Sequence, residues 1–365
     1  VPFYVIIPKN IDLDNKGISI YTSNNYSKIK DGISYNNFWK PIADKIGDKK
    51  TIYISLGGIY NSINLNTLFN PKTNKYLIEE KDINIVKSGH SFILNTRKEK
   101  RTYINNTATI VGFPNYDLDE SKTLNSIESY AAARDLNPFW IDSLTRGTMH
   151  ASPLPGTKVE AENISKTLNK NKWNVTTLIN DKASEKNIKN IKDARVLHIA
   201  THGYFFEDIP LDKENNKFMG IDKNKAIQDP MLRSGLLFSG ANKTLNGEKT
   251  QGENGLLSSY EASLLDLRNT ELVVLSACET GKGEIKNSEG VYGLRKAFSD
   301  AGAENIIMSL WKVDDEVTQE FMTTFYSTWL KGKTIRDAFN ETQLKIKKKY
   351  PQPYYWGAFV LVGSD

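Results

Sequence analysis

The sequence predicts an α/β protein whose mostly parallel sheet is flanked by helices. From about residue 108 onward, short apolar runs alternate with segments whose apolar residues recur at helical spacing. Parallel strands need crossover connections, so this alternation is typical of a parallel sheet covered on both faces. The chain has 365 residues, of which 39% are hydrophobic, which suffices for one large or two modest domains.

Residues 1–106 are rich in Asn, Lys, Tyr and Ile and predict a smaller, strand-rich N-terminal region. Clusters of Asn, Asp and Gly separate its short extended segments, as turns do. The predicted strands are Phe3–Ile7, Ile18–Tyr21, Thr51–Leu56 and Ser91–Leu94, and one helix is predicted near Asn36–Ile46.

Residues 107–365 form the second predicted domain. Its predicted strands are Ala108–Phe113, Val175–Ile179, Arg195–Ala200, Leu272–Leu275, Asn305–Leu310 and Ala358–Val362. Its predicted helices are Lys158–Leu168, Glu185–Ile191, Gly290–Ala301, Glu316–Leu330 and a last one from an N-cap at Thr334 to about Lys348. The polar stretch Phe206–Gly255 is interpreted as mobile loops over a site, interrupted by a short element at Met231–Phe238.

Composition excludes several classes of protein. Lys and Arg number 48 and Asp and Glu 43, so the net charge is only +5, and no direct nucleic-acid partner is expected. No run of about 18 apolar residues is present, so no membrane span is expected. No signal peptide is visible, and the single cysteine fits a reducing compartment, so a cytoplasmic location is expected.

Metal and nucleotide sites also lack support in the sequence. One cysteine excludes a disulfide within the chain and a cysteine-rich zinc site. The four histidines are not paired at metal-ligand spacing, so we expect no metal and no cofactor. Neither a phosphate-binding glycine loop nor a G-x-S-x-G elbow is present.

The two most reactive side chains each follow a predicted strand. His202 and Gly203 follow Arg195–Ala200, and Cys278 follows Leu272–Leu275. Sites form at the carboxyl ends of parallel strands, so the imidazole can meet the thiol there and take its proton. The backbone N–H groups of Gly203 and Cys278 are candidates for an oxyanion hole. From these residues alone, an inert buried cysteine and a structural histidine explain the pattern about equally well.

A resemblance to a known family extends this interpretation. Thr201-His202-Gly203 and Ser276–Gly281 resemble the CHAT family, whose members are relatives of caspases and separase. Further matching motifs are Leu154–Thr157, Asp229–Leu236, Tyr260-Glu261-Ala262, Glu289-Gly290 and Leu310–Asp315. In order and spacing, these motifs cover about residues 108 to 365.

The resemblance implies a caspase-like fold and a cysteine endopeptidase that cleaves one or a few proteins through a thioester. Its histidine maps onto His202 and its nucleophile onto Cys278, with no obligatory third catalytic residue. It also implies an upstream helical-repeat regulatory region or an activating partner, and an association with bacterial defence. The competing hypothesis is a binding or scaffold module with little turnover, since caspase-like folds include inactive members.

The resemblance directs the search for a substrate pocket to four residues. Ser276 occupies the pocket-lining position two before the cysteine, but it is small and uncharged. After Trp311, Asp315 or its neighbour Asp314 falls where separase holds an acidic residue that receives arginine. A pocket for a basic residue is therefore one hypothesis, and an N-cap formed by Asp314 is the alternative. Self-cleavage within 206–255 is also plausible, because that stretch is polar and long.

Overall fold

We describe the chain from a computed structural model. It describes residues 12–95, 102–103, 105–118, 139–142, 148–205, 217–218, 221–222, 224, 229–248, 250, 252–277, 289–311 and 314–363. Cys278 and the predicted strand Phe3–Ile7 lie outside these residues.

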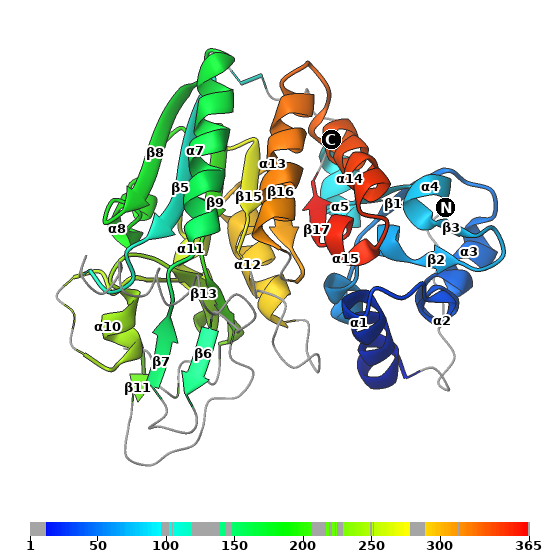
Figure 1. The fold of residues 1–365 in the computed structure, drawn as a ribbon, viewed down its shortest axis with the longest axis horizontal. Helices are drawn as coiled ribbons and strands as arrows, with labels where there is room; N and C mark the ends of the chain where they lie inside the picture. Colours follow the sequence, from blue (N-terminus) through cyan, green and yellow to red (C-terminus); the bar gives the residue numbers. More distant parts are fainter. Residues whose placement is uncertain are drawn as a thin grey trace.

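An eight-stranded, mostly parallel sheet forms the centre of the molecule (Figure 1). The strand order is β1 (Thr51–Ile54), β4 (Asp82–Ile85), β17 (Phe359–Val362), β16 (Asn305–Ser309), β15 (Leu272–Leu275), β9 (Val196–Ala200), β5 (Thr107–Pro114) and β8 (Asn174–Asn180). All neighbouring pairs are parallel except β16 with β17. The predicted mostly parallel α/β sheet is thus confirmed, and its inner strands β9 and β15 are buried along their whole length.

Helices cover both faces of this sheet. On one face, α7 (Pro155–Lys170), α13 (Asp315–Trp329) and α14 (Ile335–Lys349) lie side by side (Figure 1). Helix α7 leads from β5 outward to β8, whereas α12 (Glu289–Asp300) leads from β15 to β16 in the opposite direction. Right-handed crossovers therefore place α12 on the other face.

The direction in which successive strands are added reverses between β5 and β9. Strand β8 is added on one side of β5, while β9, β15 and β16 follow on the other side. Their carboxyl ends are level, since Gly112 pairs with Ala200, Ile199 with Leu275, and Leu275 with Met308. Such a switch point leaves a crevice at the carboxyl edge, where ligands bind in open α/β sheets.

A second, antiparallel sheet begins directly after β9. It contains β10 (Gly203–Phe205), β13 (Ser234–Leu237) and β14 (Leu256–Ser258). Strand β13 and the 3₁₀ turn η5 (Pro230–Leu232) account for the short element predicted at Met231–Phe238. The described part of 206–255 is only partly loop, because β13 and α10 (Ala241–Leu245) are built into the core.

The remaining elements are short. The short strand pairs are β2 (Phe69–Asn70) with β3 (Lys75–Tyr76), β6 (Phe139–Asp142) with β7 (Thr148–Ala151) and β11 (Lys217–Phe218) with β12 (Ile221–Asp222). The short helices are α2 (Gly32–Ser34), α3 (Lys40–Ile46), α4 (Leu77–Glu80), α8 (Glu185–Lys189), α11 (Ser259–Ser263) and α15 (Pro353–Trp356). The helical turns are η1 (Leu13–Gly17), η2 (Tyr35–Trp39), η3 (Gly58–Ser62) and η4 (Leu65–Thr67). Among the described residues, no helix combines the length and the apolar character needed to cross a membrane.

Two predicted strands of the N-terminal region are helices. Ile18–Tyr21 lies in α1 (Ile18–Tyr26), and Ser91–Leu94 lies in α5 (Gly89–Asn95). Helix α1 buries Ile18, Tyr21 and Asn25, a spacing of three and four residues that belongs to a helix face. The strand predicted at Thr51–Leu56 and the helix predicted near Asn36–Ile46 correspond to β1 and to η2 with α3.

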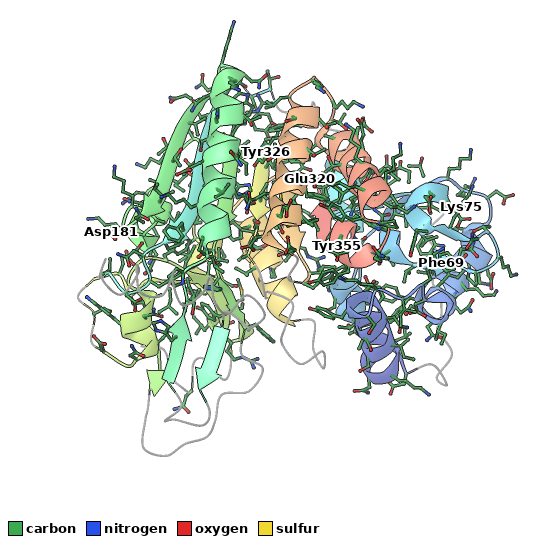
Figure 2. All side chains as sticks on the ribbon, in the orientation of Figure 1. Phe69, Lys75, Asp181, Glu320, Tyr326 and Tyr355 are labelled. Atoms are coloured by element: carbon green, nitrogen blue, oxygen red, sulfur yellow. The ribbon has the colours of Figure 1, made fainter. Side chains whose placement is uncertain are left out.

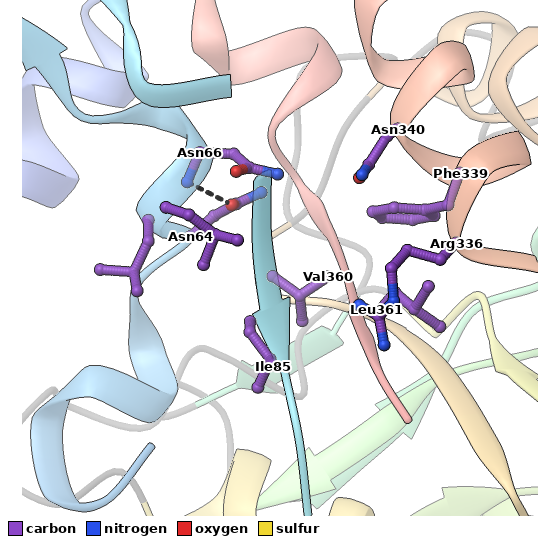
Figure 3. Close-up of a pocket in the computed structure, with 10 residues that line it drawn as sticks. Asn64, Asn66, Ile85, Arg336, Phe339, Asn340, Val360 and Leu361 are labelled. Atoms are coloured by element: carbon purple, nitrogen blue, oxygen red, sulfur yellow. Dashed lines mark hydrogen bonds between the residues drawn. The ribbon is translucent and has the colours of Figure 1, made fainter. Parts of the chain in front are cut away.

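The N-terminal region shares the central sheet with the rest of the chain. Its strands β1 and β4 extend the sheet through the pairing of Ile85 with Val362. The division at residue 106 therefore remains a prediction. Figure 3 shows a pocket where Arg336, Phe339 and Asn340 of α14 approach this junction. Its volume of about 20 Å³ has room for about one water molecule, far too little for a peptide.

Candidate active site

His202 lies at the carboxyl edge of the sheet, between the end of β9 and the start of β10. The residue is fully buried, and its Nε2 lies 2.7 Å from the main-chain carbonyl oxygen of Ser152. A carbonyl oxygen can only accept, so Nε2 must carry a proton. In the neutral ring, Nδ1 is then the basic nitrogen, and this carbonyl fixes both the tautomer and the ring orientation.

Tyr116 supports His202 from the neighbouring strand, just beyond the end of β5. Its hydroxyl oxygen accepts the backbone N–H of His202 at 3.3 Å, and its ring centroid lies 5.3 Å from the imidazole. Because the Thr201 hydroxyl donates to the Leu237 carbonyl, the Tyr116 O–H donates to Thr201 Oγ1 over 2.9 Å. Sequence reasoning missed Tyr116, although its place after a strand at the switch point was a usable signal.

Cys278 lies outside the described residues, but the two residues before it are described and buried. The Ser276 N–H donates to the Ile199 carbonyl at 2.9 Å, and the Ser309 hydroxyl donates to the Ala277 carbonyl at 2.7 Å. The chain that leads to Cys278 is thus fixed to strand β9 on one side and to strand β16 on the other.

The register of β9 and β15 relates the two predicted catalytic positions. Ile199 pairs with Leu275; His202 follows Ile199 by three residues, and Cys278 follows Leu275 by three. Neighbouring strands lie about 4.8 Å apart, so the segments that follow Ile199 and Leu275 leave the sheet at the same level, and the described part of the second segment ends at Ala277.

Gly203 is the first residue of β10, at the edge of the second sheet. The Leu237 N–H donates to the carbonyl of His202, so these two residues form a hydrogen-bonded pair of the antiparallel ladder. Because the two kinds of pair alternate, the next pair, Gly203 with Leu236, is a non-hydrogen-bonded one. The backbone N–H of such a residue points away from the partner strand. The Gly203 N–H therefore points away from β13.

A buried polar network lies beneath the carboxyl edge on the face covered by α7 and α13. Glu160 of α7 accepts the Ser276 hydroxyl at 3.1 Å through Oε2, and its Oε1 lies 3.0 Å from His198 Nε2. The other ring nitrogen, His198 Nδ1, lies 3.2 Å from the hydroxyl of Tyr326, which is labelled in Figure 2. Burial, and then the charge of Glu160, raise the pKa of Tyr326 well above its usual value, so this phenol keeps its proton.

The predicted substrate residues after β16 make different contacts. Asp314 is the N-cap of α13, because its carboxylate accepts the N–H of Glu316 at 2.9 Å and that of Val317 at 3.4 Å. Asp315 instead lies against Gly156 in the first turn of α7, where an added Cβ would come within 2.5 Å of Asp315 Oδ2. Trp311 is buried and donates its indole N–H to the Tyr354 carbonyl at 2.9 Å.

The geometry therefore brings His202, Gly203 and Ser276 to one edge of the sheet. It places Asp315 beside α7 and packs Trp311 toward the carboxyl-terminal helix α15. No cluster of three or more potential metal ligands occurs among the residues that the structure describes.

The fold is an α/β module with a mostly parallel sheet flanked by helices, and His202 lies at the switch point of that sheet. The chain belongs to the CHAT domain family, whose model matches residues 35–364. The match includes residues 35–106 as well as the part of the chain that contains His202 and Cys278.

Curated relatives match a shorter part of the chain. Tetratricopeptide repeat protein 28 of Mus musculus is 35% identical over 107 residues, and the Homo sapiens protein is 34% identical over 107 residues. These residues are 28% of this chain and 4% of each relative, so this chain spans a small part of their length.

Two solved structures show a distant likeness. The Arg-specific cysteine proteinase gingipain R is 10% identical, with 96% of this chain and 74% of that chain covered and a TM-score of 0.47. The separase–securin complex of Saccharomyces cerevisiae is 11% identical, with 86% of this chain and 15% of that chain covered and a TM-score of 0.39.

Proposed function

We propose that this protein is a cysteine endopeptidase with Cys278 as nucleophile and His202 as general base. The observation that carries the proposal is the pairing of Ile199 in β9 with Leu275 in β15, because His202 and Cys278 each follow one of these paired residues by three positions in the sequence. The hydrogen bond from His202 Nε2 to the Ser152 carbonyl supports the proposal, because it leaves Nδ1 as the nitrogen that can take a proton.

The reaction follows from these roles. The Cys278 thiol gives its proton to His202 Nδ1, and the thiolate attacks the peptide carbonyl carbon. The N–H groups of Gly203 and Cys278 stabilise the oxyanion. As the C–N bond breaks, the imidazolium returns its proton to the departing amine, which leaves a thioester. Water, deprotonated by the neutral imidazole, then hydrolyses the thioester and restores the thiol.

Asp315 is proposed to select a basic residue before the cleaved bond. Its carboxylate lies against Gly156 at the start of α7, on the helix that covers β5 and β9. Asp314 is engaged as the N-cap of α13, which makes Asp314 less suited to this role. The hydroxyl of Ser276 bonds to Glu160, so Ser276 is expected to line the pocket through its backbone. The proposal leaves Trp311 as a residue that supports the pocket by packing.

Self-cleavage and regulation are part of the same proposal. Leu236, Leu237 and Phe238 are buried, so cleavage in or next to β13 would require unfolding. A site after one of the lysines at 213, 217, 223 and 225 is favoured instead, given a basic preference. An upstream helical-repeat region or an activating partner is proposed to control activity, since the matched relatives are tetratricopeptide repeat proteins.

The test compares wild type with Cys278→Ala and His202→Gln on a library of peptides, with cleavage sites read by mass spectrometry. We expect cleavage by wild type, none by Cys278→Ala, and a loss of at least about 10³-fold in His202→Gln. Replacement of the exposed His90 by Gln is the matched control and should leave the rate unchanged.

A second measurement does not require a substrate. Because Cys278 is the chain's single cysteine, its rate of alkylation by iodoacetamide reports on this thiol alone. We expect alkylation at pH 6 to be much faster than for an ordinary thiol, and slow in His202→Gln. Ordinary thiol reactivity and no cleavage by wild type would overturn the proposal and leave a binding module as the conclusion. Cleavage by Cys278→Ala would show instead that Cys278 is not the nucleophile.

A further inference from the structure

We infer that Glu160, Ser276 and His198 form a positioning network that fixes the chain segments leading to Cys278 and to His202 and thereby supports the proposed dyad. This inference rests on the proposed function, and it assigns the three side chains no contact with substrate. It gives the Ser276 hydroxyl a role within the protein.

The first step concerns burial. Glu160 is 3% exposed and His198 is 0% exposed, so both are removed from water. A buried carboxylate is costly unless hydrogen bonds replace its hydration. The Ser276 hydroxyl and the Nε2–H of His198 supply such bonds, one to each carboxylate oxygen. The carboxylate therefore holds its two partners in fixed places.

The second step concerns where these partners lie. Ser276 precedes Cys278 by two residues, and His198 precedes His202 by four residues. Their strands β15 and β9 are neighbours, and His198 pairs with Val274. One carboxylate on α7 thus bonds to both chain segments that lead to the proposed dyad.

The third step concerns rigidity on the far side of the imidazole. The Tyr326 hydroxyl lies 3.2 Å from His198 Nδ1, and it keeps its proton. The two ring nitrogens of His198 thus lie within hydrogen-bonding distance of Glu160 on one side and of Tyr326 on the other. The His198 ring is therefore held between α7 and α13, which fixes the side chain at the centre of β9.

The fourth step relates the network to the proposed pocket. Glu160 follows Gly156 by one helical turn, so the two residues lie on the same face of α7. Gly156 contacts Asp315, and Glu160 contacts Ser276. One helix therefore contacts both Asp315 and the residue two positions before the proposed nucleophile.

The test uses the full chain with Ser276→Ala, Glu160→Gln and the double variant. Glutamine can offer only one oxygen, so Glu160→Gln cannot accept from both partners as the carboxylate does. The matched control is Ser165→Ala. This substitution also removes a buried hydroxyl, which lies on α7 at 2.8 Å from Thr177 Oγ1 and outside the network. The readouts are the pH profile of Cys278 alkylation by iodoacetamide, kcat and KM separately, and the thermal midpoint.

We expect Ser276→Ala and Glu160→Gln each to lower alkylation near pH 6 about tenfold, with the limiting rate at high pH unchanged. The value of kcat should fall by a similar factor at constant KM, and the double variant should be no worse than Glu160→Gln. Ser165→Ala should behave as wild type in alkylation and kcat.

Two results would overturn the inference. In the first, Ser276→Ala and Glu160→Gln fold and alkylate like wild type at every pH, even with lowered thermal midpoints. In the second, Ser276→Ala folds and keeps its wild-type profile while Glu160→Gln fails to fold, which leaves Glu160 with a structural role only. Ordinary thiol reactivity in wild type would instead contradict the proposed function itself, so the two failures are distinguishable.

Discussion

His202 donates a hydrogen bond from Nε2 to the main-chain carbonyl oxygen of Ser152 over 2.7 Å. A main-chain acceptor does here what a buried carboxylate does in a catalytic triad: it orients the imidazole and selects its tautomer. The proposed dyad therefore needs no third catalytic side chain. Because a substitution cannot remove this carbonyl, the support of His202 is best tested through its other neighbour, Tyr116.

Tyr116→Phe removes the hydroxyl that accepts the His202 N–H and donates to Thr201, while the ring remains against the imidazole. We expect kcat to fall about tenfold, equivalent to about 1.4 kcal/mol, because the His202 backbone loses a fixed support. The free energy of unfolding should fall by about 1 kcal/mol. Peptidase kinetics and urea unfolding measure the two effects.

The chain contains a close control for this substitution. Tyr21 is also buried, its hydroxyl lies 2.9 Å from Thr67 Oγ1, and it accepts the Asn64 N–H at 3.1 Å. Tyr21→Phe should cost a similar amount of stability and leave kcat unchanged. Equal kcat values for Tyr116→Phe and Tyr21→Phe would show that Tyr116 does not support the site.

Asp314 and Asp315 should separate stability from specificity. Asp314→Ala removes the N-cap of α13, so we expect the free energy of unfolding to fall by about 1 kcal/mol with no change in the cleavage profile. Asp315→Asn should reduce the preference for Arg and Lys by at least about tenfold, because a charge-assisted hydrogen bond is lost. Cleavage-site profiles of both variants decide; an unchanged profile in Asp315→Asn removes the basic pocket from the proposal.

Gly156→Ala tests the contact between α7 and Asp315. The added Cβ would lie 2.5 Å from Asp315 Oδ2 and 2.8 Å from its Cβ, so the Asp315 side chain or the start of α7 must shift. We expect KM for basic substrates to rise several-fold with a smaller effect on kcat. Gly57→Ala is the control, since an added Cβ at Gly57 has nothing within 4 Å. Wild-type KM in Gly156→Ala would show that Asp315 does not set substrate affinity.

Much of the fold could be predicted from the sequence because its second half follows simple patterns. The strand Leu272–Leu275 was predicted with its observed bounds, and the Thr334 hydroxyl caps α14 by accepting the Asp337 N–H at 3.0 Å. Both signals are local: a short apolar run and a single capping residue. The shorter N-terminal segments were ambiguous. Ile18–Tyr21 is too short a run to distinguish a strand from a helix until the residues that pack against it are known.

The support of the candidate site could not be predicted, because it consists of contacts between distant residues. Glu160 lies 116 positions from Ser276, and neither residue type signals the other. The Ser152 carbonyl carries no side-chain signal at all. His198 is fully buried in β9, and its bonds to Glu160 and Tyr326 could not be foreseen from the sequence.

Glu185 provides a pH-dependent attachment for the second sheet. Its Oε2 accepts the backbone N–H groups of Asn254 at 2.9 Å and Gly255 at 3.0 Å, just before β14 begins. Lys189 lies 2.6 Å from Glu185 Oε1 and 2.7 Å from Glu253 Oε2. Burial, and then the hydrogen bond with Glu253, raise the pKa of Glu185 from 4.5 to about 7.

A folded-state pKa above the unfolded value means that the native protein holds this proton more tightly. Stability from Glu185 is therefore fully present below pH 4.5 and is lost as the pH rises toward about 7. The pKa of Glu253 is lowered, so the stability that Glu253 contributes is lost as the pH falls below the ordinary glutamate pKa of 4.5 and does not change between pH 5 and pH 8. Between pH 5 and pH 8 we expect wild type to lose on the order of 1–2 kcal/mol of unfolding free energy, with solvent near Glu253 screening part of the effect.

Glu185→Gln should abolish this loss, because the amide does not titrate and its oxygen can still accept the Asn254 and Gly255 N–H groups. Urea unfolding at pH 5 and pH 8 measures the difference for both proteins. Glu341→Gln is the control. Glu341 is paired with Lys333 and with Lys345, and these hydrogen bonds lower its pKa to about 2, so it does not titrate in this range. That variant should keep the wild-type pH dependence. An equal loss of stability in Glu185→Gln would mean that another group titrates, and that Glu185 is charged throughout.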